Sequence, residues 1–254
     1  MTSDASYEID ATGTSLDVLE HLVDAGEPVG VSELAVDLGI SKSVVHNHLS
    51  TLRNRGYVAK RDREYAPSLR LLALAERTRG STDRYREGWP AVENLADATG
   101  EAVELFLMEE HYAVPIAIAA GSSGWLPPHT CGERMSLHVN AAGKAILSSL
   151  PDDRLAGVLA ELELTAATDS TVTDRGELEA EIRRIRDSSV AFCREEQYDG
   201  VVGVAAPIGS GESDRGAALM IEGPSERLRG RYFEEDLVGQ VVSTVNEIEV
   251  AFTE

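Results

Sequence analysis

Residues 41–55 read SKSVVHNHLSTLRNR and have the spacing of one helix with two different faces. At about 3.6 residues per turn, Val45, Leu49 and Leu52 fall on one stripe, which requires an apolar core. The opposite side carries hydrogen-bonding side chains and no carboxylate: Lys42, Ser43, His46, Asn47 and Ser50. Groups of this kind can contact base edges and phosphates in the major groove of double-stranded DNA.

The residues on either side of this helix have helix-turn-helix spacing. Residues 32–38 form a short amphipathic segment for which Ser32 is the expected N-cap. Gly39 follows at the point where a helix end favours a left-handed residue, and Ser41 is the expected cap of the second helix. Residues 56–65 then read as a β-hairpin with its tip at 61–63. The pattern predicts a winged helix-turn-helix; the alternative is an ordinary helical hairpin with a solvated polar face.

The charge of the chain is strongly acidic. Its 254 residues include 44 Asp and Glu against 23 Lys and Arg, a net charge of −21 at pH 7. Only three of the basic residues are lysines: Lys42, Lys60 and Lys144. An acidic surface that uses arginine in place of lysine favours adaptation to a cytoplasm of very high salt, where screening reduces self-repulsion. The alternative is an acidic protein of ordinary salinity, which usually keeps more lysine.

One segment reverses this charge. Residues 40–63 contain six basic residues against one acid, Asp62, which leaves a local charge of +5. Phosphate contacts explain such an island best. The candidate DNA-binding residues are therefore Ser41, Lys42, Ser43, His46, Asn47, Ser50, Arg53, Lys60, Arg61 and Arg63.

The remaining pattern predicts an α+β organisation in consecutive parts. Residues 1–10 are expected to form an acidic tail, 11–66 the winged helix-turn-helix domain, and 67–80 a linker helix. From residue 101 the apolar residues alternate or form short runs, and predicted strands and helices follow one another. Residues 81–254 are therefore expected to form a second domain with an antiparallel sheet.

The chain lacks signals for a membrane or secreted protein. No apolar run reaches the ~18 residues that a membrane span needs, and the first residues are polar and acidic rather than those of a signal peptide. We therefore expect a cytoplasmic protein that does not enter membranes. Cys131 and Cys193 are too few for a disulfide framework.

Two other chemistries can be weighed from the sequence. Either cysteine could be a nucleophile, yet nothing places a base beside it. His129, Cys131 and His138 could bind zinc, but their spacing is irregular and no fourth ligand is evident. We therefore expect no catalytic residues, no metal site and no cofactor.

The chain resembles the IclR family of transcription regulators from about residue 14 to its C-terminal helix. Three segments carry the resemblance: KSVVH at 42–46, GERMSLHVNAAGKA at 132–145 and YDGVVGVAAPI at 198–208. The second is the most specific. The resemblance implies an N-terminal winged helix, a linker helix and a C-terminal GAF-like effector domain. It also implies a homodimer or a dimer of dimers on a palindromic operator.

The resemblance further implies a small-molecule effector, such as an organic acid or a sugar-derived compound. The implied ligand-binding residues are Gly124, Trp125, Met135, Ala141, Ala142, Cys193, Gly203, Met220 and Glu222. Backbone amides at the start of the helix at 141–150 suit an anion. Glu222, however, stands where the family often has a small hydroxyl residue, and a carboxylate would repel an anion. Glu222 therefore favours a polyol, sugar or lactone, unless it faces solvent.

The expected function is that of a sequence-specific DNA-binding transcription regulator under effector control. A DNA-binding protein without a ligand and a cysteine-dependent enzyme are the alternatives.

Overall fold

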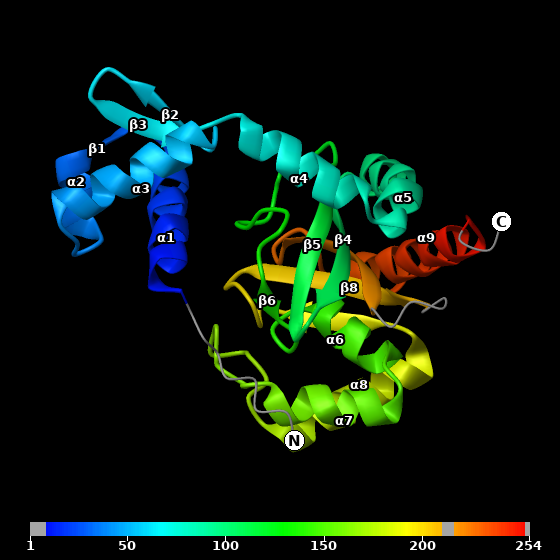
Figure 1. Cartoon of the computed structure of the whole chain (residues 1–254). Coiled ribbons are helices and arrows are strands. Elements are labelled where there is room, and N and C mark those ends of the chain that lie inside the picture. The colour runs from blue at the N-terminus through cyan, green and yellow to red at the C-terminus, as the bar shows by residue number, and fades with distance from the viewer. Residues whose placement is uncertain (1–8, 210–215, 252–254) are drawn as a thin grey trace. The chain divides into compact units, whose positions relative to one another are not determined.

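The computed structural model describes residues 9–209 and 216–251 (Figure 1). The chain divides into two compact units, Met1–Ser81 and Thr82–Glu254. In the part of the chain that the structure describes, every helix is too short or too polar to cross a membrane.

The N-terminal unit contains four helices and a small antiparallel sheet with strand order β1-β3-β2 among its described residues. Its elements are α1 (Asp10–Asp24), β1 (Val29–Gly30), α2 (Val31–Asp37), α3 (Lys42–Asn54), β2 (Val58–Arg61), β3 (Glu64–Pro67) and α4 (Arg70–Gly80). Val45, Leu49 and Leu52 of α3 are buried in one core with Val18 and Leu22 of α1. The apolar stripe predicted for α3 is confirmed.

The local chemistry of the winged helix-turn-helix follows the sequence. The backbone N–H of Val44 donates to the Ser41 hydroxyl over 3.3 Å, so Ser41 caps α3. Gly39 has a φ of 65° at the turn between α2 and α3. The wing is β2 and β3, in which Arg61 pairs with Glu64 across a two-residue turn, and Asp62 has a φ of 55°. The predicted fold of this unit is confirmed.

Two details at its N-terminal side differ from expectation. Helix α2 begins at Val31 with Gly30 in the cap position, so Ser32 lies in the first turn rather than at the N-cap. The reason is that Gly30 pairs with Glu64 in the sheet, and the chain passes directly from strand into helix. Of the expected acidic tail, residues 1–8 lie outside the described residues and Asp10 already begins α1.

The C-terminal unit is built on a six-stranded antiparallel sheet with the order β6-β5-β4-β9-β8-β7. Its strands are β4 (Ala102–Glu109), β5 (Tyr112–Ala119), β6 (Met135–Ser136), β7 (Ala191–Arg194), β8 (Val201–Ile208) and β9 (Ala217–Pro224). Its helices are α5 (Asp83–Thr99), α6 (Ala141–Ser149), α7 (Asp152–Glu161), α8 (Arg175–Ser188) and α9 (Leu237–Ala251), with a π-helix at Tyr232–Asp236. The predicted α+β class is confirmed, whereas β7 was not predicted.

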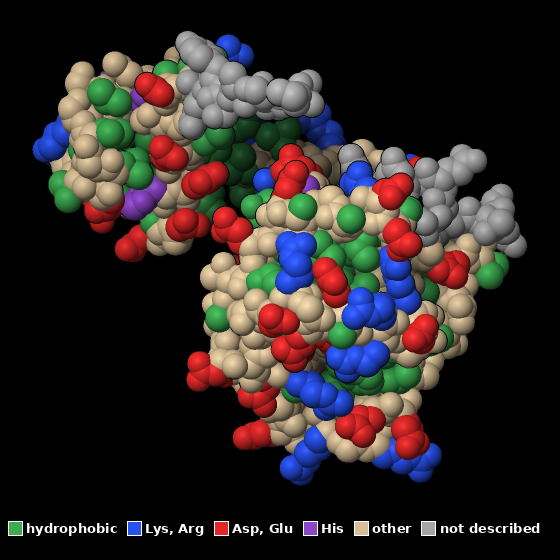
Figure 2. Space-filling model, turned by 90° about the horizontal axis from the view of Figure 1, so that it is seen from below, with side chains coloured by type: hydrophobic (Ala, Val, Ile, Leu, Met, Phe, Trp, Pro, Cys, Tyr) green, Lys and Arg blue, Asp and Glu red, His purple; other side chains and the backbone are tan. Residues whose placement is uncertain are grey.

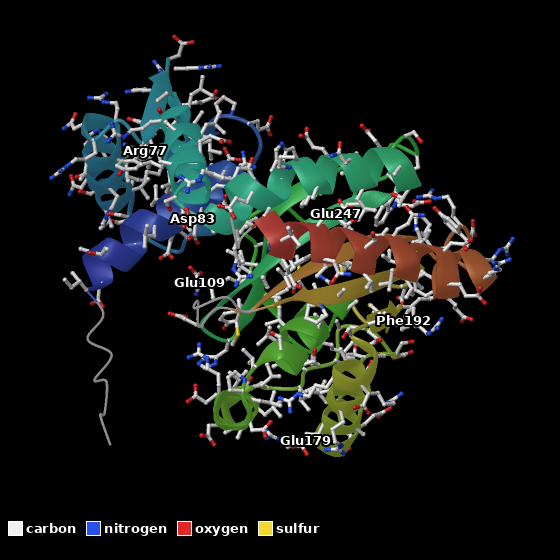
Figure 3. All side chains as sticks on the ribbon, turned by 90° about the vertical axis from the view of Figure 1, so that its right-hand side faces the viewer. Arg77, Asp83, Glu109, Glu179, Phe192 and Glu247 are labelled. Carbon is white, nitrogen blue, oxygen red and sulfur yellow. The ribbon has the colours of Figure 1, made fainter. Side chains whose placement is uncertain are left out.

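Side-chain alternation gives this sheet two different faces. Val103, Leu105 and Leu107 of β4 pack in the core that α5 and α9 complete. Phe106 and Met108 point the other way, into the core that α6 and α8 complete. Figure 3 shows α5 and α9 on one side of the sheet and α6 and α8 on the other. We call the second side the α6 face.

Gly143 lets α6 approach the chain before it closely. A Cβ atom at this position would lie 2.3 Å from the Leu137 carbonyl oxygen, which no real side chain could tolerate. By contrast, a Cβ atom at Gly157 in α7 would meet nothing within 4 Å. Both residues lie inside helices, so they form a matched pair.

We expect Gly143→Ala to destabilise the protein by about 1–3 kcal/mol or more, because the added carbon overpacks a backbone contact. Gly157→Ala should be neutral or stabilising by up to about 1 kcal/mol, since alanine is the better helix former. Urea unfolding of both variants at one KCl concentration measures the difference. Equal stability of the two variants would contradict the close approach.

Candidate functional site

The polar side of α3 is free of the core. Lys42, Ser43, His46 and Asn47 are exposed, and Ser50 is half-buried. Ser41 is also exposed, but its hydroxyl already accepts the Val44 N–H, so it fixes where the helix starts. The structure therefore presents the candidate DNA-reading residues on one helical face.

The basic residues of the segment 40–63, which we call the basic island, are exposed. All six of its basic side chains are exposed: Lys42, Arg53, Arg55, Lys60, Arg61 and Arg63. Among the described residues, none of them lies within 4.0 Å of a carboxylate. Acidic side chains are spread over the surface of both units on the face shown in Figure 2. Cations without an acidic partner on such a protein can contact phosphates without first breaking an ion pair.

The α6 face of the C-terminal unit brings together most of the candidate ligand-binding residues. Five share one buried core cluster: Met135, Ala141, Ala142, Cys193 and Met220. Gly203 and Glu222 lie opposite each other on β8 and β9, and a Cβ atom on Gly203 would be 3.2 Å from the Cβ of Glu222. The structure therefore gathers seven residues from four separate stretches of the chain.

The two remaining candidates, Gly124 and Trp125, form backbone hydrogen bonds within their own loop. Gly124 is exposed and Trp125 is half-buried in the loop between β5 and β6. Their backbone N–H groups donate to the Gly121 carbonyl and the Ser123 hydroxyl. Their role in binding a ligand stays a prediction.

Glu222 does not face solvent, so that alternative is wrong. Its residue is 3 % exposed, and it lies beside Glu104 of β4 and His129 of the loop between β5 and β6. The reason is register: Glu104 pairs with Met220, so Glu222 is the next residue of β9 on the same face. The His129 Nε2 lies 2.7 Å from Glu104 Oε2, and the ligating atoms of all three residues lie within 4.8 Å of one another.

Sequence reasoning missed Glu104 and the partners of His129. The available signal for Glu104 was one carboxylate in the middle of an otherwise apolar strand. We name Glu104, His129 and Glu222 the acidic cluster.

Burial controls the ionisation of the acidic cluster. It raises the pKa of Glu104 to about 8, against a hydrogen bond with Glu222 that acts in the other direction. Burial, followed by the charge of Glu104, raises the pKa of Glu222 well above its ordinary value. Burial also lowers the pKa of His129. The Oε1 atoms of both glutamates have no hydrogen-bond partner, and each such buried group costs about 1–3 kcal/mol.

A second charged cluster on the same face contains a buried cation, Lys144. The Lys144 ammonium is fully buried and donates to Glu181 over 2.8 Å and to Glu196 over 2.6 Å. Burial lowers the pKa of Lys144, but the charges of Glu196 and Glu181 outweigh it and the pKa rises above the ordinary value. Lys144 therefore joins α6 to α8 and to the chain after β7, and its role is structural.

The start of α6 offers less to an anion than expected. The Asn140 side chain caps the helix by accepting the Gly143 N–H over 2.7 Å. One of the helix N-terminal amides is therefore already hydrogen-bonded within the protein.

The geometry disfavours a cysteine nucleophile. Burial, helped by Glu196, raises the pKa of Cys193 to about 12, so the reactive thiolate is scarce. Its sulfur lies 3.7 Å from the Val139 carbonyl oxygen, which offers no base.

The structure also does not bring His129, Cys131 and His138 together as the ligands of a zinc site. Cys131 is exposed, whereas the two ring nitrogens of His138 lie 2.8 Å from the Ser136 hydroxyl and 3.0 Å from the Thr165 carbonyl. Only His129 of that set belongs to a group with the spacing of metal ligands, and its partners there are Glu104 and Glu222.

Comparison with known proteins agrees with both units. Residues 80–250 match the family described as bacterial transcriptional regulator IclR C-terminal, and residues 15–62 match the IclR helix-turn-helix domain. The probable HTH-type transcriptional regulator ArcR of Halobacterium salinarum is 26% identical over 226 residues, which cover 87% of this chain and 86% of that protein. The matched families and this relative are transcription regulators rather than enzymes.

Solved structures are similar in fold. The crystal structure of the Thermotoga maritima IclR has a TM-score of 0.82 at 24% identity and covers 96% of this chain and 98% of its own. A double mutant of the inducer-binding domain of the PobR transcription factor from Acinetobacter, in complex with 3-hydroxybenzoic acid, has a TM-score of 0.57 at 22% identity and covers 63% of this chain and 94% of its own. With family matches to both of its units, the chain belongs to the IclR family of transcriptional regulators.

Proposed function

We propose that this regulator binds a palindromic operator in double-stranded DNA and that a small molecule held on the α6 face controls this binding. The observation that carries the proposal is the exposed basic island, with a charge of +5 inside a chain of −21. Positive charge gathered on a helix-turn-helix and its wing is the electrostatic pattern of a DNA-binding surface.

The two parts of the island have different roles in this proposal. Helix α3 enters the major groove, where His46 and Asn47 at the middle of its exposed face contact base edges. Arg61 and Arg63 of the wing contact phosphates, which contribute affinity without reading sequence.

The effector occupies the α6 face of the GAF-like C-terminal unit, near Met135, Gly203 and Met220. Support comes from the similar fold of the PobR inducer-binding domain, a double mutant of which forms a complex with 3-hydroxybenzoic acid. An organic acid, a sugar or a lactone is the class of compound in question. Because Glu222 faces the interior, hydroxyl groups of a sugar or lactone could donate to it.

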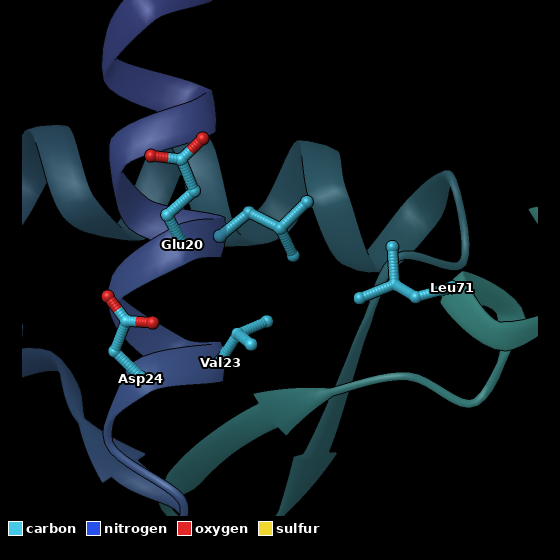
Figure 4. A pocket seen from close by; sticks show the side chains of 5 residues that line it. Glu20, Val23, Asp24 and Leu71 are labelled. Carbon is cyan, nitrogen blue, oxygen red and sulfur yellow. The ribbon is translucent and has the colours of Figure 1, made fainter. Parts of the chain in front are cut away.

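Exposed apolar side chains on the N-terminal unit support a homodimer. Leu69 and Leu72 at α4 are 82% and 62% exposed. A surface pocket of about 350 Å³ is lined by α1 and by Leu71 of α4 (Figure 4). An apolar helix next to such a hollow is suited to a second copy of the chain, and a two-fold dimer matches a palindromic operator.

The acidic composition supports a cytoplasm of very high salt. The similarity to the ArcR regulator of Halobacterium salinarum agrees with this setting.

Substitutions in the basic island should separate base reading from phosphate binding. His46→Ala or Asn47→Ala should change the preferred operator sequence, at a cost of about 1–3 kcal/mol at the affected base pair. Arg61→Ala and Arg63→Ala should weaken binding to all sequences alike, and each should reduce the salt dependence of binding by about one unit of slope. Selection from a random DNA library and titration over KCl measure these effects.

Arg154→Ala, at an exposed arginine of α7, is the control and should leave binding unchanged. The proposed roles would be wrong if the wing variants altered sequence preference while the helix variants did not.

The dimer can be tested through the exposed leucines of the linker. Leu69→Glu combined with Leu72→Glu should weaken dimerisation at least about tenfold, because charges would be buried in an apolar contact. Light scattering after gel filtration in molar KCl measures the mass. Leu126→Glu, at a leucine of the C-terminal unit that is 53% exposed, should remain dimeric. A monomeric native chain would refute the proposal.

The stability of the fold should depend on salt. Removing KCl restores the repulsion among the excess carboxylates, so the cooperative thermal transition should shift to lower temperature or disappear. Far-UV circular dichroism in molar KCl and after dialysis to low salt gives the comparison. An unchanged transition at low salt would contradict the halophilic proposal.

A further inference from the structure

The acidic cluster converges from three separate parts of the C-terminal unit. Glu104 and Glu222 lie on adjacent strands, β4 and β9, whose hydrogen-bonded register holds them on one face. His129 is supplied by the loop between β5 and β6. One ligating atom of each residue lies within 4.8 Å of those of the other two. The two carboxylates are thus fixed by the sheet, and the imidazole is brought to them.

These carboxyl groups are enclosed without a compensating cation. The Glu104 and His129 side chains are completely buried, and Glu222 is 3% exposed. In the described chain no Lys or Arg forms an ion pair with either glutamate. Their two Oε1 atoms lack any hydrogen-bond partner. Buried acidic groups normally pair with a cation or coordinate a metal ion, as Glu181 and Glu196 pair with Lys144 on the same face.

The surroundings of His129 orient its ring toward the carboxylates. The Tyr198 hydroxyl lies 3.4 Å from Nδ1, and the two rings stack with centroids 6.0 Å apart. A partner at Nδ1 leaves the lone pair of Nε2 for the side of Glu104 and Glu222. Histidines that bind metals usually have such a partner on the second nitrogen, because it sets the tautomer and the ring orientation.

We propose that Glu104, His129 and Glu222 bind one divalent transition-metal ion in the interior of the C-terminal unit. One imidazole with two carboxylates suits Zn²⁺, Mn²⁺ or Fe²⁺ better than Mg²⁺ or Ca²⁺, which prefer oxygen ligands alone. The ion balances the charge of the two carboxylates. Binding it at metal–ligand distances of about 2.0–2.2 Å replaces the 2.7 Å contact between His129 Nε2 and Glu104 Oε2.

Three protein ligands leave at least one coordination position open, as in zinc sites that also bind water or a small molecule. The assignment rests on the contacts of the acidic cluster and not on the proposed function. Loss of the ion would therefore leave the basic island intact. The competing arrangement is a pair of carboxyl groups that share a proton and hold no metal.

The test uses the full chain in molar KCl after treatment with a chelator. Zn²⁺ is added, and bound metal is measured by calorimetric titration and by elemental analysis after gel filtration. We expect one ion per chain. Because loss of an outer partner of a metal ligand lowers affinity about 10–100-fold, Glu222→Gln and His129→Asn should each lower it by more than about 100-fold.

Two variants control for buried acids and for surface histidines. Glu101→Gln changes a glutamate that is 4% exposed and pairs with Arg227. His111→Asn changes an exposed histidine beside Glu161. Both should bind Zn²⁺ like the native chain. Circular dichroism and operator binding show whether each variant is folded.

A second measurement keeps the test decisive if a cluster variant does not fold. In the native chain, Co²⁺ should produce the paramagnetically shifted N–H resonance of a single coordinated imidazole. The proposal is overturned if the native chain takes up no Zn²⁺, or if folded Glu222→Gln and His129→Asn bind it as tightly as the controls. In either case operator binding would persist, which separates this failure from a failure of the proposed function.

Discussion

The buried ammonium of Lys144 holds together the α6 face of the C-terminal unit. It ties α6 to Glu181 of α8 and to Glu196 after β7, and a buried pair that loses one partner costs about 3–5 kcal/mol. With α6 held there, Gly143 sits against the Leu137 backbone. Ala141 and Ala142 then complete the buried cluster that contains Met135 and Met220. The packing of α6 therefore explains Gly143 and Lys144 of the 132–145 motif.

The same face holds two clusters of charged groups, and they differ in whether a lysine lies among the glutamates. In one, a single cation lies between two glutamates. In the other, Glu104 and Glu222 lie close together beside the imidazole of His129, and each has an Oε1 atom without a hydrogen-bond partner among the described residues. Burying carboxylates without a paired cation is energetically unfavourable unless a bound group compensates their charge. The contrast separates a cluster that fixes the fold from one that is arranged to receive a bound group.

Periodicity was enough to predict most elements, and long-range pairing explains the failures. Helix α3 and the wing followed from apolar spacing and turn residues. Strand β7 is only four residues long, and its sequence AFCR begins with three apolar residues, so apolar and polar residues do not alternate along it. Glu104 escaped notice because its partner Glu222 is distant in sequence, and only the β4–β9 register brings them together. The sequence suggested a site of His129 with Cys131 and His138, whereas in the structure His129 lies beside these two glutamates.

The proposed regulation requires that a small molecule on the α6 face changes how the basic island binds DNA. The direct measurement is the affinity of the full chain for its operator, by fluorescence anisotropy in high KCl, with and without a saturating compound that calorimetry shows to bind. Coupling of the usual strength would shift this affinity by about 5–150-fold. We expect such a shift for at least one organic acid, sugar or lactone. A compound that binds the C-terminal unit stoichiometrically and leaves operator affinity unchanged would contradict it.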